Sequence, residues 1–253
     1  MQISIKTLCF YLFFYLSNNL VGQTPNPLID KKNIFDQQRW VDSIYSKLSL
    51  EEKVGQLFMP MVFTERDSSH FHFTLNLIKK YKVGGLVFSL GGPVEQTKWL
   101  NAFQRESKVP LMTAMDAEWG VAMRLDSVMP FPWPMTLGAI KDSTLLRKIG
   151  KRMGMQEKRL GIHYSFGPTL DINTNPKNPI IGNRSYGSSP DRVIRQALAI
   201  MKGHQEAGIL TSGKHFPGHG DTSKDSHKTL PRSKQNLRLT SNQSNKVNKL
   251  LQR

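Results

Sequence analysis

The residues with the clearest capacity for chemistry lie in segment 214–227, which contains three histidines and two aspartates. Asp225 and His227 are two positions apart, so their side chains lie on the same side if the segment is extended. A carboxylate that accepts a hydrogen bond from one imidazole nitrogen fixes the ring tautomer and raises its basicity. The other nitrogen can then exchange a proton with a substrate. The pair is therefore a candidate general acid/base.

Two other interpretations of this segment stay open. One is a solvated loop whose histidines have no chemical role. The other is a metal site formed by His215, His219, His227 and Asp221, although histidine spacings of four and eight residues match no compact zinc motif. The spacing of Asp225 and His227 favours the acid/base interpretation.

The elements that must position these residues alternate between short apolar runs and longer amphipathic runs. The apolar runs cover 57–63, 85–90, 111–116, 163–172 and 209–215, and the amphipathic runs cover 75–81, 94–106, 144–160 and 191–207. Strand followed by helix in strict alternation indicates parallel βα units. We predict an α/β fold of the TIM-type (β/α)8 class, of which about the first five βα units are present. A doubly wound sheet would alternate similarly, but no G-x-G-x-x-G opens a helix.

Polar or glycine-rich residues follow these predicted strands. They are Ser89-Leu90-Gly91-Gly92, Asp116-Ala117-Glu118, Asp171-Ile172-Asn173 and Lys214-His215. Active sites of TIM barrels are built at the C-terminal ends of the strands. The clusters are therefore expected to meet at one edge of the sheet.

The N-terminal residues resemble a signal peptide at 1–23. Lys6 supplies a positive charge, 8–16 is an apolar run, and a small polar stretch follows. The run is well short of the roughly 20 residues of a membrane-spanning helix, so we expect export to the periplasm or the extracellular space and no stable membrane span. A buried N-terminal strand is the alternative. The only cysteine, Cys9, lies in this stretch, which excludes disulfides and thiol chemistry from the remainder. Residues 24–48 are expected to form a linker and an N-terminal helix, and Ser49-Leu50-Glu51-Glu52 resembles a helix capping box.

The formal charge of +16 does not predict nucleic-acid binding. Residues 228–253 contain seven basic residues and no acidic ones, so the remainder carries 28 − 19 = +9. No stretch interleaves aromatic with basic residues, as a single-stranded nucleic-acid surface would. Basicity of this kind could still favour anionic cell-wall or membrane surfaces.

The motif Lys-His-Phe-Pro-Gly-His-Gly-Asp at 214–221, followed by Asp225-Ser226-His227, is similar to the signature of bacterial glycoside hydrolase family 3, in its β-N-acetylhexosaminidase (β-N-acetylglucosaminidase) branch. The resemblance extends over roughly 50–227, and we assign 49–227 to the N-terminal barrel domain of that family. The β-glucosidase branch shares the Lys-His pair but generally lacks the continuation, which makes it the second choice. The resemblance implies a glycan or peptidoglycan-derived sugar substrate, a retaining mechanism and no metal or organic cofactor.

The resemblance also implies roles for individual residues. It makes His227 the general acid/base and Asp225 the residue that orients it. The substrate-binding positions are Asp116, Arg124, Arg184, Lys214 and His215. From residue type alone, Asp116 could equally cap a turn, and either arginine could be a solvated surface charge.

The nucleophile expected of a retaining glycosidase, a second carboxylate about 5 Å from the acid/base group, has no candidate here. In the family it follows a later strand, whereas no Asp or Glu occurs after Asp225. The polar tail 228–253 departs from the family pattern soon after Leu230-Pro231, so a truncated barrel is expected in preference to a functional basic extension. A fragment that at most binds sugar without catalysis is therefore the alternative function, and its oligomeric state is not predictable.

Overall fold

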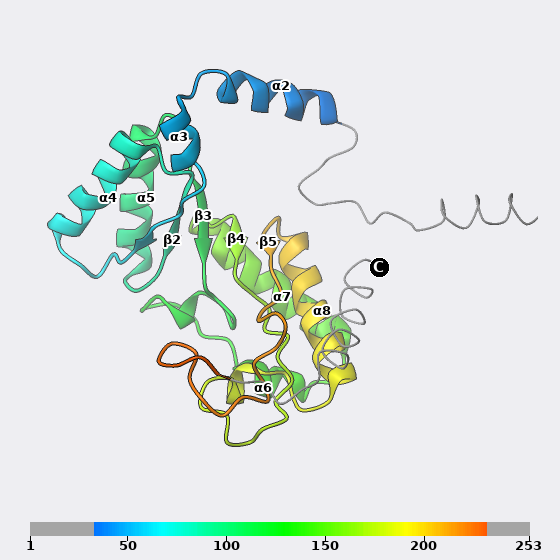
Figure 1. The fold of residues 1–253 in the computed structure, drawn as a ribbon. Coiled ribbons are helices and arrows are strands. Elements are labelled where there is room, and N and C mark those ends of the chain that lie inside the picture. The colour runs from blue at the N-terminus through cyan, green and yellow to red at the C-terminus, as the bar shows by residue number, and fades with distance from the viewer. Residues whose placement is uncertain (1–32, 232–253) are drawn as a thin grey trace, which may run out of the picture.

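A computed structural model describes residues 33–231, in which five parallel strands form one sheet (Figure 1). The strands are β1 (Met61–Val62), β2 (Gly85–Phe88), β3 (Met112–Met115), β4 (Tyr164–Ser165) and β5 (Leu210–Thr211). Their order in the sheet is β1-β2-β3-β4-β5, so each strand pairs with the next one in the chain. Sequential parallel pairing is the topology of a TIM barrel, whereas a doubly wound sheet reverses its strand order. The predicted α/β fold with five βα units is confirmed, and the doubly wound alternative is wrong for the described residues.

Helices lie before the first strand and between successive strands, and four of them coincide with the amphipathic runs predicted at 75–81, 94–106, 144–160 and 191–207. The helices are α2 (Ile34–Tyr45), α3 (Leu50–Gly55), α4 (Ser68–Tyr81), α5 (Pro93–Glu106), α6 (Pro134–Gly138), α7 (Ser143–Arg159) and α8 (Pro190–Glu206), with 3-10 turns η1 (Val121–Met123) and η2 (Gly182–Arg184). Local chemistry fixes their first turns. Ser49 and Glu52 form the predicted capping box of α3, Asp67 and Asp142 cap α4 and α7, and Pro190 begins α8.

The observed strands are shorter than the apolar runs that predicted them. The fourth run, 163–172, forms a ladder only at Tyr164–Ser165. Pro168 has no N–H to donate, which ends regular pairing. Beyond it, Thr169 makes an isolated parallel bridge with Lys214. The strand ends are therefore irregular at the edge where the polar clusters lie.

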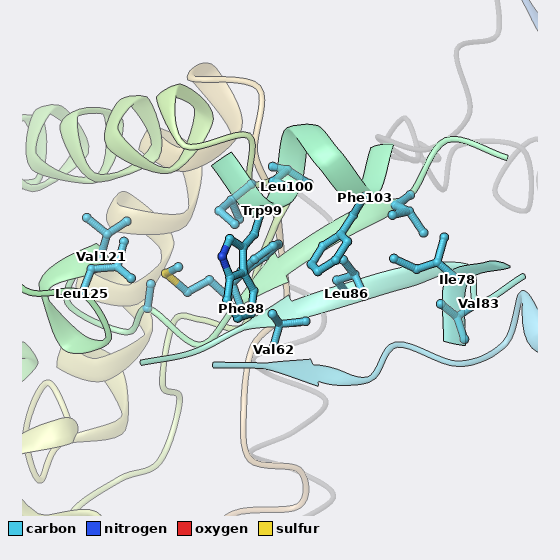
Figure 2. Close-up of a cluster of buried hydrophobic side chains, with 14 residues drawn as sticks. Val62, Ile78, Val83, Leu86, Phe88, Trp99, Leu100, Phe103, Val121 and Leu125 are labelled. Atoms are coloured by element: carbon cyan, nitrogen blue, oxygen red, sulfur yellow. The ribbon is translucent and has the colours of Figure 1, made fainter. Parts of the chain in front are cut away.

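Two apolar clusters hold the elements together. Figure 2 shows the first, where Val62, Leu86 and Phe88 from β1 and β2 lie under Trp99 and Phe103 of α5. The second joins α6, α7 and α8 through Leu137, Leu146, Met153, Tyr186, Val193, Ala197, Ala199 and Ile200. Burial of a large apolar side chain contributes about 1.5–3 kcal/mol, so these clusters are the main stabilising term.

The first strand region is more exposed than predicted. The apolar run 57–63 was predicted as a strand, but within it Phe58 is 60% and Met61 51% exposed. Met59 and Phe63 are half-buried. For Met61 the reason is the position of β1, which pairs only with β2 among the described residues and so forms an edge of the sheet. Side chains on an edge strand lack a neighbour on one side.

Helix α2 has no buried residue, and Figure 1 shows it lying apart from the sheet. In the described range 33–231, no helix combines the length and apolar character needed to span a bilayer. The predicted signal peptide, the linker up to residue 32 and the tail from residue 232 lie outside the described residues.

Candidate active site

The candidate site lies at the C-terminal ends of β3, β4 and β5. Asp116 follows β3 directly, Asp171 lies in the segment after β4, and Lys214 lies three residues beyond β5. Because the strands are parallel and adjacent, these segments emerge at the same edge of the sheet. Arg124 and Arg184 come from the loops that contain η1 and η2. Chain segments far apart in sequence are thereby brought together.

Asp116 is the first centre of an ion-pair network. Arg124 donates from Nε to the backbone carbonyl of Asp116 at 2.9 Å and from Nη2 to its Oδ2 at 2.5 Å. The ammonium group of Lys214 donates to the other carboxylate oxygen of Asp116. Asp116 is 28% and Arg124 24% exposed at the side chain. Both groups are therefore held in place but still reach solvent, as sugar-binding groups must.

Glu118 is the second centre, and the sequence analysis assigned it no role. Its side chain is fully buried and accepts a two-pronged contact from Arg184, from Nε at 2.8 Å and from Nη2 at 2.6 Å. Lys214 Nζ lies 2.8 Å from Glu118 Oε1. Burial alone would raise the pKa of Glu118, but the hydrogen bonds and charges of Arg184 and Lys214 outweigh it and hold this pKa below its ordinary value. One indication of a role for Glu118 was available from the sequence, namely its position in the polar cluster after β3.

Arg184 and Lys214 are therefore not solvated surface charges. The hydrogen bonds that Arg184 donates to Glu118 raise the pKa of Arg184, against the opposing effect of burial. Lys214 bridges the two carboxylates Asp116 and Glu118. The four predicted sugar-binding residues Asp116, Arg124, Arg184 and Lys214 thus belong to one connected network, with Glu118 as its buried member.

His215 is held by a different carboxylate. Asp171, whose side chain is fully buried, lies with Oδ2 2.6 Å from Nδ1 of His215. The same carboxylate accepts the backbone N–H of His219 at 2.6 Å. Asp171 was singled out in the sequence only as part of a polar cluster after the fourth strand.

The predicted acid/base pair is formed, but in a turn and not in an extended segment. Asp225 Oδ1 lies 2.8 Å from Nδ1 of His227 and also accepts the backbone N–H of His227 at 2.8 Å. An aspartate that bonds its own backbone two residues on is typical of a turn, which accounts for the difference. The hydrogen bond from the backbone N–H of His227 has the largest effect in lowering the pKa of Asp225, and the hydrogen bond with the His227 ring lowers it further.

The acid/base pair stands apart from the sugar-binding network in the described residues. The side chain of His227 is 78% exposed. No hydrogen bond or ion pair in the range 33–231 joins Asp225 or His227 to the Asp116 network. The roles of these two residues stay predictions.

The structure does not bring the residues of the alternative metal site, His215, His219, His227 and Asp221, together as a set of metal ligands. The rings of His215 and His219 are 6.2 Å apart between centroids. Within the part of the chain that the structure describes, no group of three or more His, Cys, Asp or Glu side chains is placed to hold a metal ion. The network offers instead ammonium, guanidinium and carboxylate groups, which suit hydroxyl groups of a sugar.

Residues 49–250 match the family described as the glycosyl hydrolase family 3 N-terminal domain. The chain therefore belongs to glycosyl hydrolase family 3. The matched range includes Glu118 and Asp171 and extends into the polar tail.

Similar proteins agree with this membership. The chain is 36% identical over 169 residues to a β-hexosaminidase A of Pseudoalteromonas piscicida, with 62% of this chain and 28% of that protein covered. A solved family 3 β-N-acetylglucosaminidase from Paenibacillus sp. is 36% identical, with TM-score 0.69 and coverage of 77% of this chain and 38% of that one. A solved β-glucoside phosphorylase, BglX, is 26% identical, with TM-score 0.79 over 92% of this chain and 41% of that one.

The chain spans less than half the length of these relatives. Coverage of the curated proteins ranges from 28% to 46% of their length. The described strands correspond to the first part of a barrel, and the relatives contain further residues beyond the matched region or before it.

Proposed function

We propose that this chain forms the sugar-binding and proton-transferring part of a retaining β-N-acetylhexosaminidase, which removes terminal β-N-acetylglucosamine from glycans or peptidoglycan-derived fragments. The observation that carries the proposal is the network in which Glu118 and Asp116 hold Lys214 and the two arginines at the C-terminal ends of the strands. Such a network keeps charged donors and acceptors oriented before a substrate arrives.

Each residue then has a defined task. Asp116 accepts hydrogen bonds from sugar hydroxyls, and Lys214 and Arg124 donate to them. His227 gives a proton to the leaving oxygen, with Asp225 fixing the ring nitrogen that faces away from the substrate. The double displacement also requires a nucleophilic carboxylate, and no Asp or Glu follows Asp225 in this sequence.

The choice of N-acetylhexosamine over glucose rests on two supports. The segment 214–227 carries the Pro-Gly-His-Gly continuation and the Asp-x-His of the β-N-acetylglucosaminidase branch. Proteins named β-hexosaminidase are 36% identical in Pseudoalteromonas piscicida and 32% in Mycobacterium tuberculosis. The N-terminal pattern around Lys6 and the run 8–16 supports export of the protein to the periplasm or cell exterior, where cell-wall fragments are available.

The experiment measures bond cleavage by the 253-residue chain with azide supplied as an external nucleophile. Azide attacks the anomeric carbon, the glycosidic bond breaks, and the products are an N-acetylglucosaminyl azide and the phenol. Two substrates distinguish proton donation from the other steps of cleavage. The p-nitrophenolate group of the p-nitrophenyl N-acetyl-β-glucosaminide leaves without a proton. The phenolate group of the unsubstituted phenyl glycoside needs a proton as it leaves. We expect azide-dependent release from both and little release without azide.

The variant His227→Ala identifies the proton donor. Loss of a general acid costs about 10²-fold or more, so release of phenol should fall by that factor while release of p-nitrophenol is nearly unchanged. His72→Ala, an exposed histidine on α4, is the matched control and should leave both rates unchanged.

Three results would change the proposal. Equal loss in both variants would remove His227 from catalysis. No release with azide, together with measurable sugar binding, would establish the non-catalytic fragment. Faster cleavage of the p-nitrophenyl β-glucoside than of the N-acetylglucosaminide would assign the β-glucosidase branch.

A further inference from the structure

Two carboxylates at the strand ends, Glu118 and Asp171, have fully buried side chains. A buried charge is costly unless it is paired or fully hydrogen-bonded. Glu118 meets this requirement with the cations Arg184 and Lys214. Asp171 meets it differently, because every donor to its carboxylate comes from the segment His215–His219.

The contacts of Asp171 divide between ring and backbone. Oδ2 faces Nδ1 of His215 at 2.6 Å and the backbone N–H of His215 at 3.3 Å, and Oδ1 accepts the backbone N–H of His219 at 2.6 Å. A carboxylate has only acceptors, so Nδ1 of His215 must carry the hydrogen. In the neutral ring, Nε2 is then the bare acceptor nitrogen.

The outward direction of Nε2 follows from burial. The side chain of His215 is 37% exposed, while Asp171 is fully buried. Because Nδ1 points to the buried Asp171, Nε2 lies on the side of the ring that faces away from this carboxylate. Lys214, the preceding residue, presents only donors.

The rest of the loop is fastened to the same segment after β4. Asn178 donates to the carbonyl of His219 at 2.7 Å, and Asn175 donates from its backbone to the carbonyl of Gly220 at 3.2 Å. A Cβ on Gly220 would lie 1.9 Å from the carbonyl oxygen of Ile172, so the two segments are in close contact. The backbone of the loop therefore has anchors besides Asp171, whereas among residues 33–231 the ring of His215 has Asp171 as its one hydrogen-bond partner.

We propose that Asp171 is a positioning residue that holds His215 in the Nδ1–H tautomer, so that the site presents an acceptor at His215 beside a donor at Lys214. A sugar with neighbouring hydroxyl groups can then donate from one to Nε2 and accept at the other from Nζ. The recognition of sugar rests on the proposed function, but the tautomer does not.

The experiment is a long-range ¹H–¹⁵N spectrum of the histidine rings in the 253-residue chain, recorded through a pH titration that locates the neutral form. The wild-type chain should show His215 as the Nδ1–H tautomer. Asp171→Asn replaces an acceptor-only group with one that also donates, and we expect loss of the single Nδ1–H form. Asn178→Ala is the matched control, since it loosens the same loop at His219 and should leave the His215 tautomer unchanged.

The outcomes separate the two proposals. If neutral His215 in the wild-type chain is in the Nε2–H form, the proposed role of Asp171 is overturned. This measurement uses the wild-type chain only, so it does not depend on the folding of a variant. Asp171→Leu removes the acceptor altogether, and an unchanged tautomer in that variant overturns the proposed role too. Titration with N-acetylglucosamine should shift Nε2 of His215, with binding about tenfold weaker in Asp171→Asn. Absence of that shift with the Nδ1–H tautomer in place would contradict the sugar site and leave the positioning role intact.

Discussion

Replacement of Glu118 by Gln tests the buried centre of the ion-pair network. The side chain of Glu118 is fully buried, and its partners Arg184 and Lys214 are 18% and 17% exposed. Removing one member of a buried ion pair costs about 3–5 kcal/mol, because the remaining charges are left uncompensated. Glutamine keeps one acceptor oxygen, and Lys214 keeps Asp116, so we expect the lower end, a loss of about 3 kcal/mol in the free energy of unfolding.

The assay is equilibrium urea unfolding of the 253-residue chain, followed by circular dichroism. Glu106→Gln is the matched control: it breaks an ion pair with Lys79 of similar length, 2.7 Å, in which the two side chains are 52% and 46% exposed. A solvent-exposed pair of this kind contributes little to stability, because water and salt screen it. Equal destabilisation by the two substitutions would refute the view that burial gives the Glu118 contacts their importance.

Three further predictions concern stability. Burial lowers the pKa of His204, but Glu157, at 3.5 Å, outweighs it and holds this pKa above its ordinary value of 6.5. The stabilisation is therefore fully present below the ordinary pKa and lost as the pH rises through the higher folded-state pKa, so the difference in unfolding free energy between wild type and His204→Gln should shrink as the pH rises above 6.5. Gly150→Ala should destabilise the protein by about 2 kcal/mol in thermal unfolding, although alanine has the better helix propensity. The new Cβ would lie 2.3 Å from the carbonyl oxygen of Ile200. Unchanged stability would contradict the close contact of α7 and α8. The hydroxyl of buried Tyr186 has no hydrogen-bond partner among the described residues, so Tyr186→Phe should leave stability unchanged or raise it by up to about 1 kcal/mol, and a clear loss in urea unfolding would reveal a missing partner.

The sequence was sufficient to predict the order of elements, because strand and helix periodicities are local properties. It also placed Asp116 and Lys214 at one edge, since parallel strands deliver their ends to the same edge of a sheet. Arg124 and Arg184 were assigned to the same site only through the resemblance to the family. The extent of the strands was not predictable, because apolar composition continues past residues such as Pro168 that cannot pair. The exposure of Met61 depends on which strands lie beside β1, and the sequence of β1 itself does not specify its neighbours.

The two buried carboxylates show another limit of sequence analysis. Glu118 and Asp171 lie in polar clusters that were recognised, yet residue type alone does not separate a ligand-binding carboxylate from one that holds a ligand-binding group. Burial makes that distinction: Asp116 is 28% exposed, whereas Glu118 and Asp171 are fully buried. Burial of a polar side chain depends on segments distant in sequence, such as η2 and the loop after β5.

Sugar binding is the most direct test of the claim that the network at the strand ends is a sugar-binding site of family 3. Isothermal titration of the 253-residue chain with N-acetylglucosamine should show binding that Asp116→Asn weakens about tenfold or more, since a charged hydrogen-bond partner contributes about 1.5–3 kcal/mol. Asp126→Asn, an exposed aspartate in the same loop, should bind like wild type. No binding by the wild-type chain, or equal affinity in all three proteins, would contradict the account.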